Sequence, residues 1–330
     1  MTPASTKVVP ADSQSVGLAA QWMRQGFLAS FPTETVYGLG GSTFDEQPLS
    51  RIYRLKGRPG DNPLIAHLRG LADLDLVADP TPAQRAMLER LAAIFWPGPL
   101  TIVVPKQPAV PLAASGGRDT IAVRVPAHPV ALALLEAFGG PISAPSANRS
   151  GHVSPTSAAH VLSDFPEEPQ LLVVDGGPSR VGVESTVLDL TSSPPRILRP
   201  GSVTESQIAA LIGPVESSPI REQSASPGTA ARHYSPRTPA RMLPASRIPA
   251  AIREERPPCV VLAITPIDVP APHARLAMPP DAESYASRLY SVLREVDDAG
   301  FGTIIVERPL AIDGLWAAIL DRLERATTAS

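Results

Sequence analysis

Lysine is scarce in this chain, and one of its lysines lies where an anion could be held. Of 29 basic residues, only Lys7, Lys56 and Lys106 are lysines. Lys56 belongs to the Gly/Pro-rich stretch RLKGRPGDNPLIAHL, residues 54–68, and stands two positions before Arg58. A lysine offers a point charge and an arginine a fork of donors, so both could converge on a polyphosphate. A solvated basic turn is the alternative on spacing alone.

Two further stretches place neutral polar side chains beside glycine or proline. In FPTETVYGLGG, residues 31–41, Thr33 and Thr35 precede three glycines, where the backbone could approach a ligand closely. PISAPSANRSGHVSPT, residues 141–156, offers uncharged donors that suit phosphate or carboxylate oxygens. A glycine-rich turn and a set of Asx and Ser turns are the respective alternatives. The polar residues of the second stretch are Ser143, Ser146, Asn148 and Ser154.

Isolated polar residues in apolar, strand-like runs form a further group. Arg124 lies in IAVRVP and Arg199 in RILRPG, and an arginine in a buried sheet must be paired or reach a ligand. Exposure on an edge strand is the alternative. Asn62 can donate an amide hydrogen bond. His67 stands among apolar residues and, taken alone, resembles a satisfied core histidine more than a catalytic one.

The composition excludes several classes of protein. A net charge of −3 argues against a nucleic-acid coat protein. The single cysteine, Cys259, excludes an internal disulfide or a multi-cysteine zinc site, and its apolar neighbours predict a buried thiol. With no secretory pattern and no apolar run of spanning length, we expect a cytoplasmic protein without a membrane span. Walker A, H-E-x-x-H and G-x-S-x-G motifs do not occur.

Strands and helices interleave through residues 10–212, which predicts one α/β unit. Because several strands follow one another directly, a mixed sheet is favoured over a parallel one. Thr81 is a plausible N-cap for one of the helices, and another helix is predicted to begin at Ser154. Predicted helices cover residues 13–26, 81–95, 129–140 and 204–213, and predicted strands cover residues 27–33, 100–106, 120–126, 141–148, 170–177, 184–191 and 196–201.

A linker and a smaller unit follow. Residues 213–239 are rich in Pro, Ser and Gly, which predicts a long linker. Residues 240–330 give the order strand, helix, strand, helix, which suggests a small doubly wound domain. No G-x-G-x-x-G follows its first strand, so no dinucleotide site is indicated. The helix predicted over residues 281–300 has Tyr285, Leu289, Leu293 and Val296 on one face.

Taken together, these stretches resemble a known family. FPTETVYGLG, KGRPGDNPLIAHL, WPGPLT, AVRVPAHP, APSANRSGHVSPT, VESTVLDL and LRPG are similar to the YrdC-type threonylcarbamoyl-AMP synthases. SPGTAARHYSPRTPARML and the closing GLWAAILDRLERA resemble the long form, which adds a linker and a C-terminal domain. The resemblance implies a twisted mixed α/β sheet with a cationic cavity, followed by a small Rossmann-like domain.

The resemblance also implies an activity. The family is a group of nucleotidyltransferases that form L-threonylcarbamoyladenylate and pyrophosphate from L-threonine, bicarbonate and ATP. A separate tRNA threonylcarbamoyl transferase then modifies an adenosine of certain tRNAs. Magnesium is expected with the ATP, without assigned protein ligands. Bicarbonate and threonine would first form a short-lived carbamate that the cavity must shelter from water. The family gives no general base for this chain.

Residue by residue, the family's K-x-R and S-x-N set falls on Lys56, Arg58, Ser146 and Asn148. Lys56 and Arg58 are the expected catalytic pair. The remaining ATP contacts match Asn62, Thr120, Ser154, Arg199 and Tyr234, and the threonine contacts match Thr35, His67, Arg124, Ala144 and Ser185. Many relatives have S-P-G-M-K-x-x-H-Y in the linker, whereas Thr229 and Ala230 replace the Met and Lys here. The resemblance therefore does not extend to a linker lysine.

Two other functions remain open at this stage. One is a tRNA- or double-stranded-RNA-binding module that uses the cavity without catalysis, against which the negative net charge weighs. The other is a carbamoyl-adenylating maturation factor, which usually carries the cysteine-rich zinc modules that this chain lacks. For the linker, we expect residues 226–236 to fold over the cavity as a lid with Tyr234 near the nucleotide, and a passive tether is the alternative.

Overall fold

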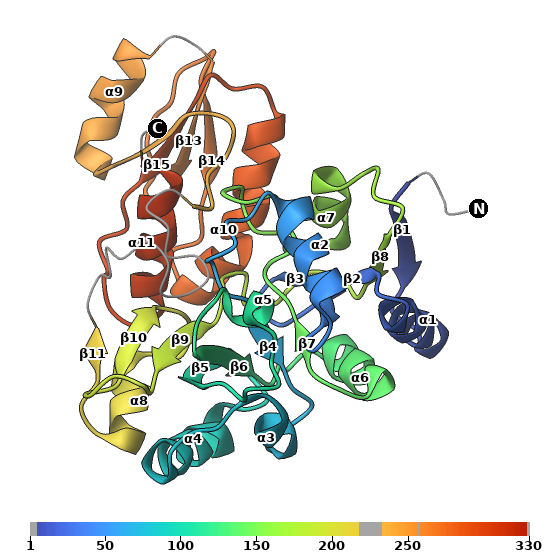
Figure 1. Ribbon diagram of the computed structural model, residues 1–330. Coiled ribbons are helices and arrows are strands. Elements are labelled where there is room, and N and C mark those ends of the chain that lie inside the picture. The colour runs from blue at the N-terminus through green and yellow to red at the C-terminus, as the bar shows by residue number, and fades with distance from the viewer. Residues whose placement is uncertain (1–4, 218–232, 256–257, 329–330) are drawn as a thin grey trace.

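The computed structural model describes residues 5–217, 233–255 and 258–328, and these form two α/β units (Figure 1). Within these ranges the first unit has one eleven-stranded sheet and the second a four-stranded sheet. Both the mixed α/β unit and the small Rossmann-like unit predicted from the sequence are therefore confirmed.

The large sheet combines both strand directions. Five of its neighbouring pairs are antiparallel (β2–β3, β3–β7, β7–β4, β6–β5 and β9–β10) and the others are parallel. In sheet order the strands are β1 (Lys7–Pro10), β8 (Leu171–Asp175), β2 (Leu28–Pro32), β3 (Tyr37–Ser42), β7 (Ile142–Ser143), β4 (Ile65–His67), β6 (Thr120–Arg124), β5 (Leu100–Pro105), β9 (Thr186–Asp189), β10 (Arg196–Arg199) and β11 (Glu216–Ser217).

Local signals set most helix boundaries of this unit. The carboxylate of Asp12 accepts a 2.7 Å hydrogen bond from the Ser15 amide and starts α1. Thr81 and Gln84 form a capping box at the start of α4, as predicted. The helices are α1 (Ser13–Arg24), α2 (Glu46–Lys56), α3 (Leu74–Val77), α4 (Pro82–Phe95), α5 (Leu112–Ser115), α6 (Pro129–Phe138), α7 (Ala158–Asp164) and α8 (Glu205–Ile212), with a 3-10 turn at Leu71–Asp73.

One predicted helix start and one of the alternatives for this unit are wrong. The helix expected from Ser154 begins at Ala158, because Ser157 is its cap and the Ser154 hydroxyl bonds to Glu184 instead. The glycines after Tyr37 do not form a turn but belong to β3. A β-carbon on Gly40 would lie 2.7 Å from Ile142 and from Phe31, so its lack of a side chain lets the strand pack closely.

The small sheet is entirely parallel. Its strand order is β12 (Ala240–Leu243), β15 (Thr303–Glu307), β13 (Cys259–Ala263) and β14 (Ala274–Ala277). Strands β12 and β14 are short edge strands that were not predicted. The helices are α9 (Ile248–Glu254), α10 (Ala282–Asp298) and α11 (Leu315–Ala326), with a 3-10 turn at Ala245–Arg247. The thiol of Cys259 is buried, as predicted, with its Sγ 2.8 Å from Nδ1 of His273.

Apolar packing joins the two units. The predicted apolar face of α10 is buried in a cluster that also includes Val36, Val153 and Val183 of the first unit. Figure 1 shows α10 and α11 on the side of the small sheet that faces the large one. Gly182 has φ +78°, and a β-carbon there would lie 2.3 Å from the Ala286 carbonyl oxygen of α10. The two units therefore meet with backbone against backbone.

Across the described ranges, no helix combines the length and the apolar character that crossing a bilayer requires.

Substituting Gly182 tests this contact. Gly177 has nearly the same conformation, φ +81°, but open space around its α-carbon. Gly177→Ala should cost roughly 1–2 kcal/mol through backbone strain alone, whereas Gly182→Ala should cost about 1–3 kcal/mol more because of the clash with α10. Urea unfolding of both variants measures the difference. Equal stability of the two variants would show that the close approach at Gly182 is unimportant.

Candidate active site

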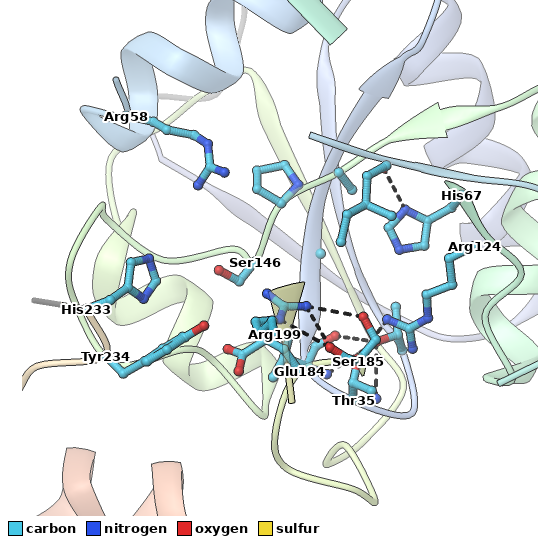
Figure 2. A pocket seen from close by; sticks show the side chains of 16 residues that line it. Thr35, Arg58, His67, Arg124, Ser146, Glu184, Ser185, Arg199, His233 and Tyr234 are labelled. Carbon is cyan, nitrogen blue, oxygen red and sulfur yellow. Dashed lines mark hydrogen bonds between the residues drawn. The ribbon is translucent and has the colours of Figure 1, made fainter. Parts of the chain in front are cut away.

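One cavity collects residues that lie far apart in the sequence, from Thr33 to Tyr234 (Figure 2). Its walls come from four strands (β3, β4, β6 and β10), from the segments after β2, α2 and β7, and from the segments before β9 and β12. The lining residues are Thr33, Thr35, Val36, Gly38, Arg58, Ile65, His67, Arg124, Ala144, Pro145, Ser146, Glu184, Ser185, Arg199, His233 and Tyr234. This set includes nine of the predicted contacts.

Arg124 anchors one side of the cavity. Its guanidinium forms a 2.6 Å ion pair with Glu34 and donates to Oγ1 of Thr35 at 3.0 Å and to the Gly98 carbonyl at 3.1 Å. Burial would raise the pKa of Glu34, but the charge of Arg124 lowers it below its usual value. Both side chains are buried, so the edge-strand alternative for Arg124 is excluded. This side presents an arginine whose charge is already balanced.

His67 lies beside Arg124 in the adjacent strand. Its Nδ1 is 3.1 Å from the Ile65 carbonyl oxygen, and its ring meets Phe31 edge-on. Burial, with a further contribution from Arg124, lowers the pKa of His67 to about 4. The ring is therefore neutral at neutral pH, which favours a proton on Nδ1 facing the carbonyl. His67 can recognise a ligand through its shape and hydrogen bonds but adds no charge to the cavity.

Lys56 and Arg58 are buried, so the solvated-turn alternative is wrong. Lys56 donates to the carbonyl oxygens of Ser146, at 2.6 Å, and Asn148. Arg58 donates to the Asn62 carbonyl at 3.0 Å, to the Asn62 side-chain oxygen at 2.5 Å and to the Pro63 carbonyl at 2.8 Å. Among the described residues, neither cation has a carboxylate within ion-pair distance.

Burial disfavours the charged forms of Lys56 and Arg58. It lowers the pKa of Lys56 well below its usual value, and the nearby charge of Arg58 adds to the effect. Burial likewise lowers the pKa of Arg58 to about 10. Carbonyl oxygens satisfy the donors and fix their directions without cancelling their charge. An anion bound here would recover electrostatic energy that the free protein lacks.

The segment after β7 holds Lys56 through its backbone. Ser146 donates to Oδ1 of Asn148 at 2.5 Å, and Nδ2 of Asn148 donates to the carbonyls of Arg149 and His152. Only Ser146 of this group reaches the cavity wall. Asn148 is fully buried and bonds within its own segment, an arrangement that shapes the loop around Lys56.

Arg199 and Ser185 form the floor between the two sides (Figure 2). Arg199 donates to the Ser185 carbonyl through Nε at 3.1 Å and Nη2 at 3.0 Å, and Nη2 also lies 3.2 Å from the Ser185 hydroxyl. That hydroxyl is 2.7 Å from Oγ1 of Thr101. Burial lowers the pKa of Arg199, as it does for Arg58. Arg199 is therefore a second cation, besides Arg58, that carbonyl oxygens hold at the cavity wall.

Glu184 is a lining residue that sequence reasoning did not assign. Its carboxylate accepts hydrogen bonds from Ser154 at 2.6 Å, Tyr290 at 2.9 Å and Arg322 at 2.8 Å. Burial would raise the pKa of Glu184, but the charges of Arg322 and Arg199 lower it to about 2. Two of these partners belong to the C-terminal unit, outside the motifs that identified the site. The local sequence around Glu184 does not indicate that it pairs with residues of the C-terminal unit.

The end of the linker closes the cavity from the other side. His233 and Tyr234 both line it, and Tyr234 has φ +61° and stacks on Tyr290 with ring centroids 5.6 Å apart. Nδ1 of His233 is buried and has no hydrogen-bond partner in the part of the chain that the structure describes. The rest of the expected lid, residues 226–232 with Thr229 and Ala230, lies outside the described residues.

Five predicted contacts do not reach the cavity wall. Lys56, Asn148 and Ser154 are buried directly behind it and bond to residues that line it or shape it. Asn62 holds the guanidinium of Arg58. Thr120 is half-buried at the start of β6, the strand that ends at Arg124. Their contacts with a nucleotide stay predictions.

Buried neutral histidines make stability depend on pH. Because the pKa of His67 is about 4 in the folded chain and about 6.5 when unfolded, the unfolded state binds more protons between these values. Stability should therefore fall as the pH drops below about 6.5, by about 2 kcal/mol for His67 between about pH 7 and pH 5. Urea unfolding at both pH values measures this loss.

His67→Gln is the matched variant, because it removes the titrating ring. We expect a smaller loss of stability on acidification for this variant than for the unchanged chain. Identical pH dependence in both would mean that His67 is not held neutral by burial.

Comparisons with known proteins find similarity over nearly the whole chain. A family model of Sua5, YciO and YrdC, described as telomere recombination, matches residues 21–201. A second model, described as the C-terminal domain of threonylcarbamoyl-AMP synthase, matches residues 203–328.

Two curated relatives have the same overall extent. Threonylcarbamoyl-AMP synthase of Pyrococcus abyssi is 40% identical over 326 residues, covering 94% of this chain and 94% of the relative. Threonylcarbamoyl-AMP synthase of Bacillus subtilis is 36% identical over 342 residues, covering 97% of this chain and 95% of the relative. The crystal structure of P. abyssi Sua5 complexed with L-threonine superposes with a TM-score of 0.89 at 38% identity, covering 98% of each chain.

Proposed function

The chain belongs to the threonylcarbamoyl-AMP synthase family, and we propose that it forms L-threonylcarbamoyladenylate and pyrophosphate from L-threonine, bicarbonate and ATP. The proposal rests on a cavity whose two sides hold their arginines in different ways. Arg124 is balanced by Glu34, whereas Arg58 is held by carbonyl oxygens. One side suits the single charge of an amino-acid carboxylate and the other suits a polyphosphate.

The threonine side would contain Arg124, Thr35 and His67. The guanidinium of Arg124 would pair with the carboxylate of threonine, while Thr35 and neutral His67 would contact its polar groups. The P. abyssi relative was crystallised with L-threonine, which supports an amino-acid site in this fold. Ala144 and Ser185 also line the cavity and would complete the predicted threonine set.

The nucleotide side would contain Arg58 and Arg199, with Lys56 close behind. First, the amine of threonine attacks bicarbonate, and loss of water gives the carbamate. A carbamate oxygen then attacks the α-phosphate of ATP, the bond to the bridging oxygen of the β-phosphate breaks, and pyrophosphate leaves. This step needs alignment and charge stabilisation more than a protein nucleophile. Buried cations with fixed directions supply both.

Magnesium would accompany ATP as part of the substrate. The described residues contain no group of three or more His, Cys, Asp or Glu side chains that could hold a metal ion. Glu184, the carboxylate on this side, already accepts from three donors. The phosphates and water would therefore hold the ion, and no step requires a protein ligand for it.

His233 and Tyr234 would cover the bound nucleotide. Both rings are buried against the cavity, and the stacking of Tyr234 on Tyr290 connects this cover to α10. Such a cover would exclude water from the carbamate, which hydrolyses quickly when exposed. The C-terminal unit would then anchor the cover.

The product would pass to a tRNA threonylcarbamoyl transferase. Because its product would serve tRNA modification, we expect the chain to act in the cytoplasm. An RNA-binding module without catalysis is not favoured, because the full-length relatives are synthases and the net charge is −3.

Product analysis tests the reaction. The purified chain should release pyrophosphate from ATP only when threonine and bicarbonate are both present, because the carbamate is the attacking group. Mass spectrometry should detect threonylcarbamoyladenylate in the same mixture. Equal pyrophosphate release without threonine would contradict the proposed reaction.

Charge removal tests the nucleotide side. Lys56→Ala and Arg58→Ala should each lose about ten- to a hundredfold in kcat/KM for ATP, since a charge-assisted contact contributes roughly 1.5–3 kcal/mol. Lys7→Ala is the control, because Lys7 is exposed on β1 and lies outside the cavity. A folded Lys56 or Arg58 variant with the activity of the control would remove that residue from the proposal.

A further inference from the structure

We propose that Arg322, in the last helix of the chain, is a positioning residue for the nucleotide side of the cavity, acting through Glu184 and Tyr234. It lies in the closing stretch GLWAAILDRLERA, to which the resemblance assigned no site residue, and it does not line the cavity itself. Because the role concerns ATP, it rests on the proposed function.

Arg322 is fully buried and contacts three separate segments of the site. Its Nε donates to Glu184 at 2.8 Å, and its Nη2 donates to the carbonyl of Pro200 at 3.0 Å. The guanidinium carbon lies 5.3 Å from the centre of the Tyr234 ring, within cation–π range. Asp321, its neighbour in α11, accepts from Nη1 at 2.6 Å and fixes the remaining edge.

Three of these contacts lie close to Arg199, the cation that the Ser185 carbonyl holds at the floor of the cavity. Pro200 follows Arg199, and Glu184 precedes Ser185, whose carbonyl accepts from Arg199. Tyr234 lines the same side of the cavity. One buried guanidinium therefore holds the backbone just after Arg199, the side chain of Glu184 and the ring of Tyr234. Loss of Arg322 would release three elements of the nucleotide side at once.

The group that would hold the threonine carboxylate does not depend on this contact. Ser185, also in the predicted threonine set, follows Glu184, but its hydroxyl lies 2.7 Å from Oγ1 of Thr101 in the first unit. Arg124 is fixed by Glu34, Thr35 and the carbonyl of Gly98, all from the first unit. A positioning role for Arg322 thus predicts an asymmetry between the two substrates. General docking of the C-terminal unit would affect both substrates alike.

Arg294 offers a matched comparison. From α10 it forms a 2.6 Å ion pair with Asp164 and donates to the Val153 carbonyl, so it also joins the two units through a largely buried contact. None of these residues lines the cavity. Arg294→Met therefore removes an interunit arginine without touching Glu184 or Tyr234.

The experiment compares Arg322→Met, Arg322→Lys and Arg294→Met in the full chain. Steady-state assays give KM for ATP and for threonine, and calorimetry with a non-hydrolysable ATP analogue gives the nucleotide affinity directly. For Arg322→Met we expect KM for ATP to rise about tenfold or more while KM for threonine changes less than about twofold. Arg322→Lys should be intermediate, because a lysine keeps the charge but cannot make the paired contacts.

Removing Arg322 alone leaves Glu184 buried without its partner, which can prevent folding. The double variant Arg322→Met/Glu184→Gln removes both charges and keeps the test possible. It should show the same selective loss of ATP affinity. Arg294→Met should leave both KM values within about twofold of the unchanged chain.

Three results would overturn the positioning role. They are an unchanged KM for ATP in a folded Arg322→Met or double variant, an equal rise in both KM values, and an equal effect of Arg294→Met. If the unchanged chain makes no threonylcarbamoyladenylate, the proposed function fails. Calorimetry then still decides whether Arg322 positions a nucleotide site.

Discussion

Burial of cations against carbonyl oxygens is the constraint on which the site depends. Lys56 and Arg58 are removed from water, and their donors point at main-chain and amide oxygens that carry no net charge. The donors are satisfied, yet the charges remain, which lowers the pKa of both groups. In the free protein these buried positive charges are electrostatically unfavourable. A bound polyanion would stabilise them.

Carboxylates appear where a balanced charge is needed. Glu34 pairs with Arg124 and Glu184 pairs with Arg322, and in both pairs the arginine gains a fixed direction. The large sheet brings Arg124 and Arg199 to one cavity because β6 ends at Arg124 and β10 ends at Arg199. The C-terminal unit then completes the nucleotide side through α10 and α11. The second unit thus supports the wall of the site through its contacts with Glu184 and Tyr234.

Much of the fold followed from local signals in the sequence. The helix over residues 13–26, the N-cap Thr81 and the apolar face of residues 281–300 were all indicated by residues within a few helical turns of one another. Edge strands such as β12 and β14 were missed because they are short and only half-buried. Family motifs identified the cavity residues, but Arg322 and Tyr290 pair with Glu184 across more than 100 positions. Local sequence patterns do not indicate contacts between residues that are so far apart in the chain.

Proton uptake on ATP binding tests the central claim most directly. If burial holds the pKa of Lys56 low and the phosphates of ATP restore it, binding at a pH between the lowered and the ordinary lysine pKa must take up protons. Calorimetry in two buffers of different ionisation enthalpy measures this uptake. The carbonyl-held site predicts clear uptake that is lost in Lys56→Met. Binding of ATP without proton uptake, or equal uptake in that variant, would contradict it.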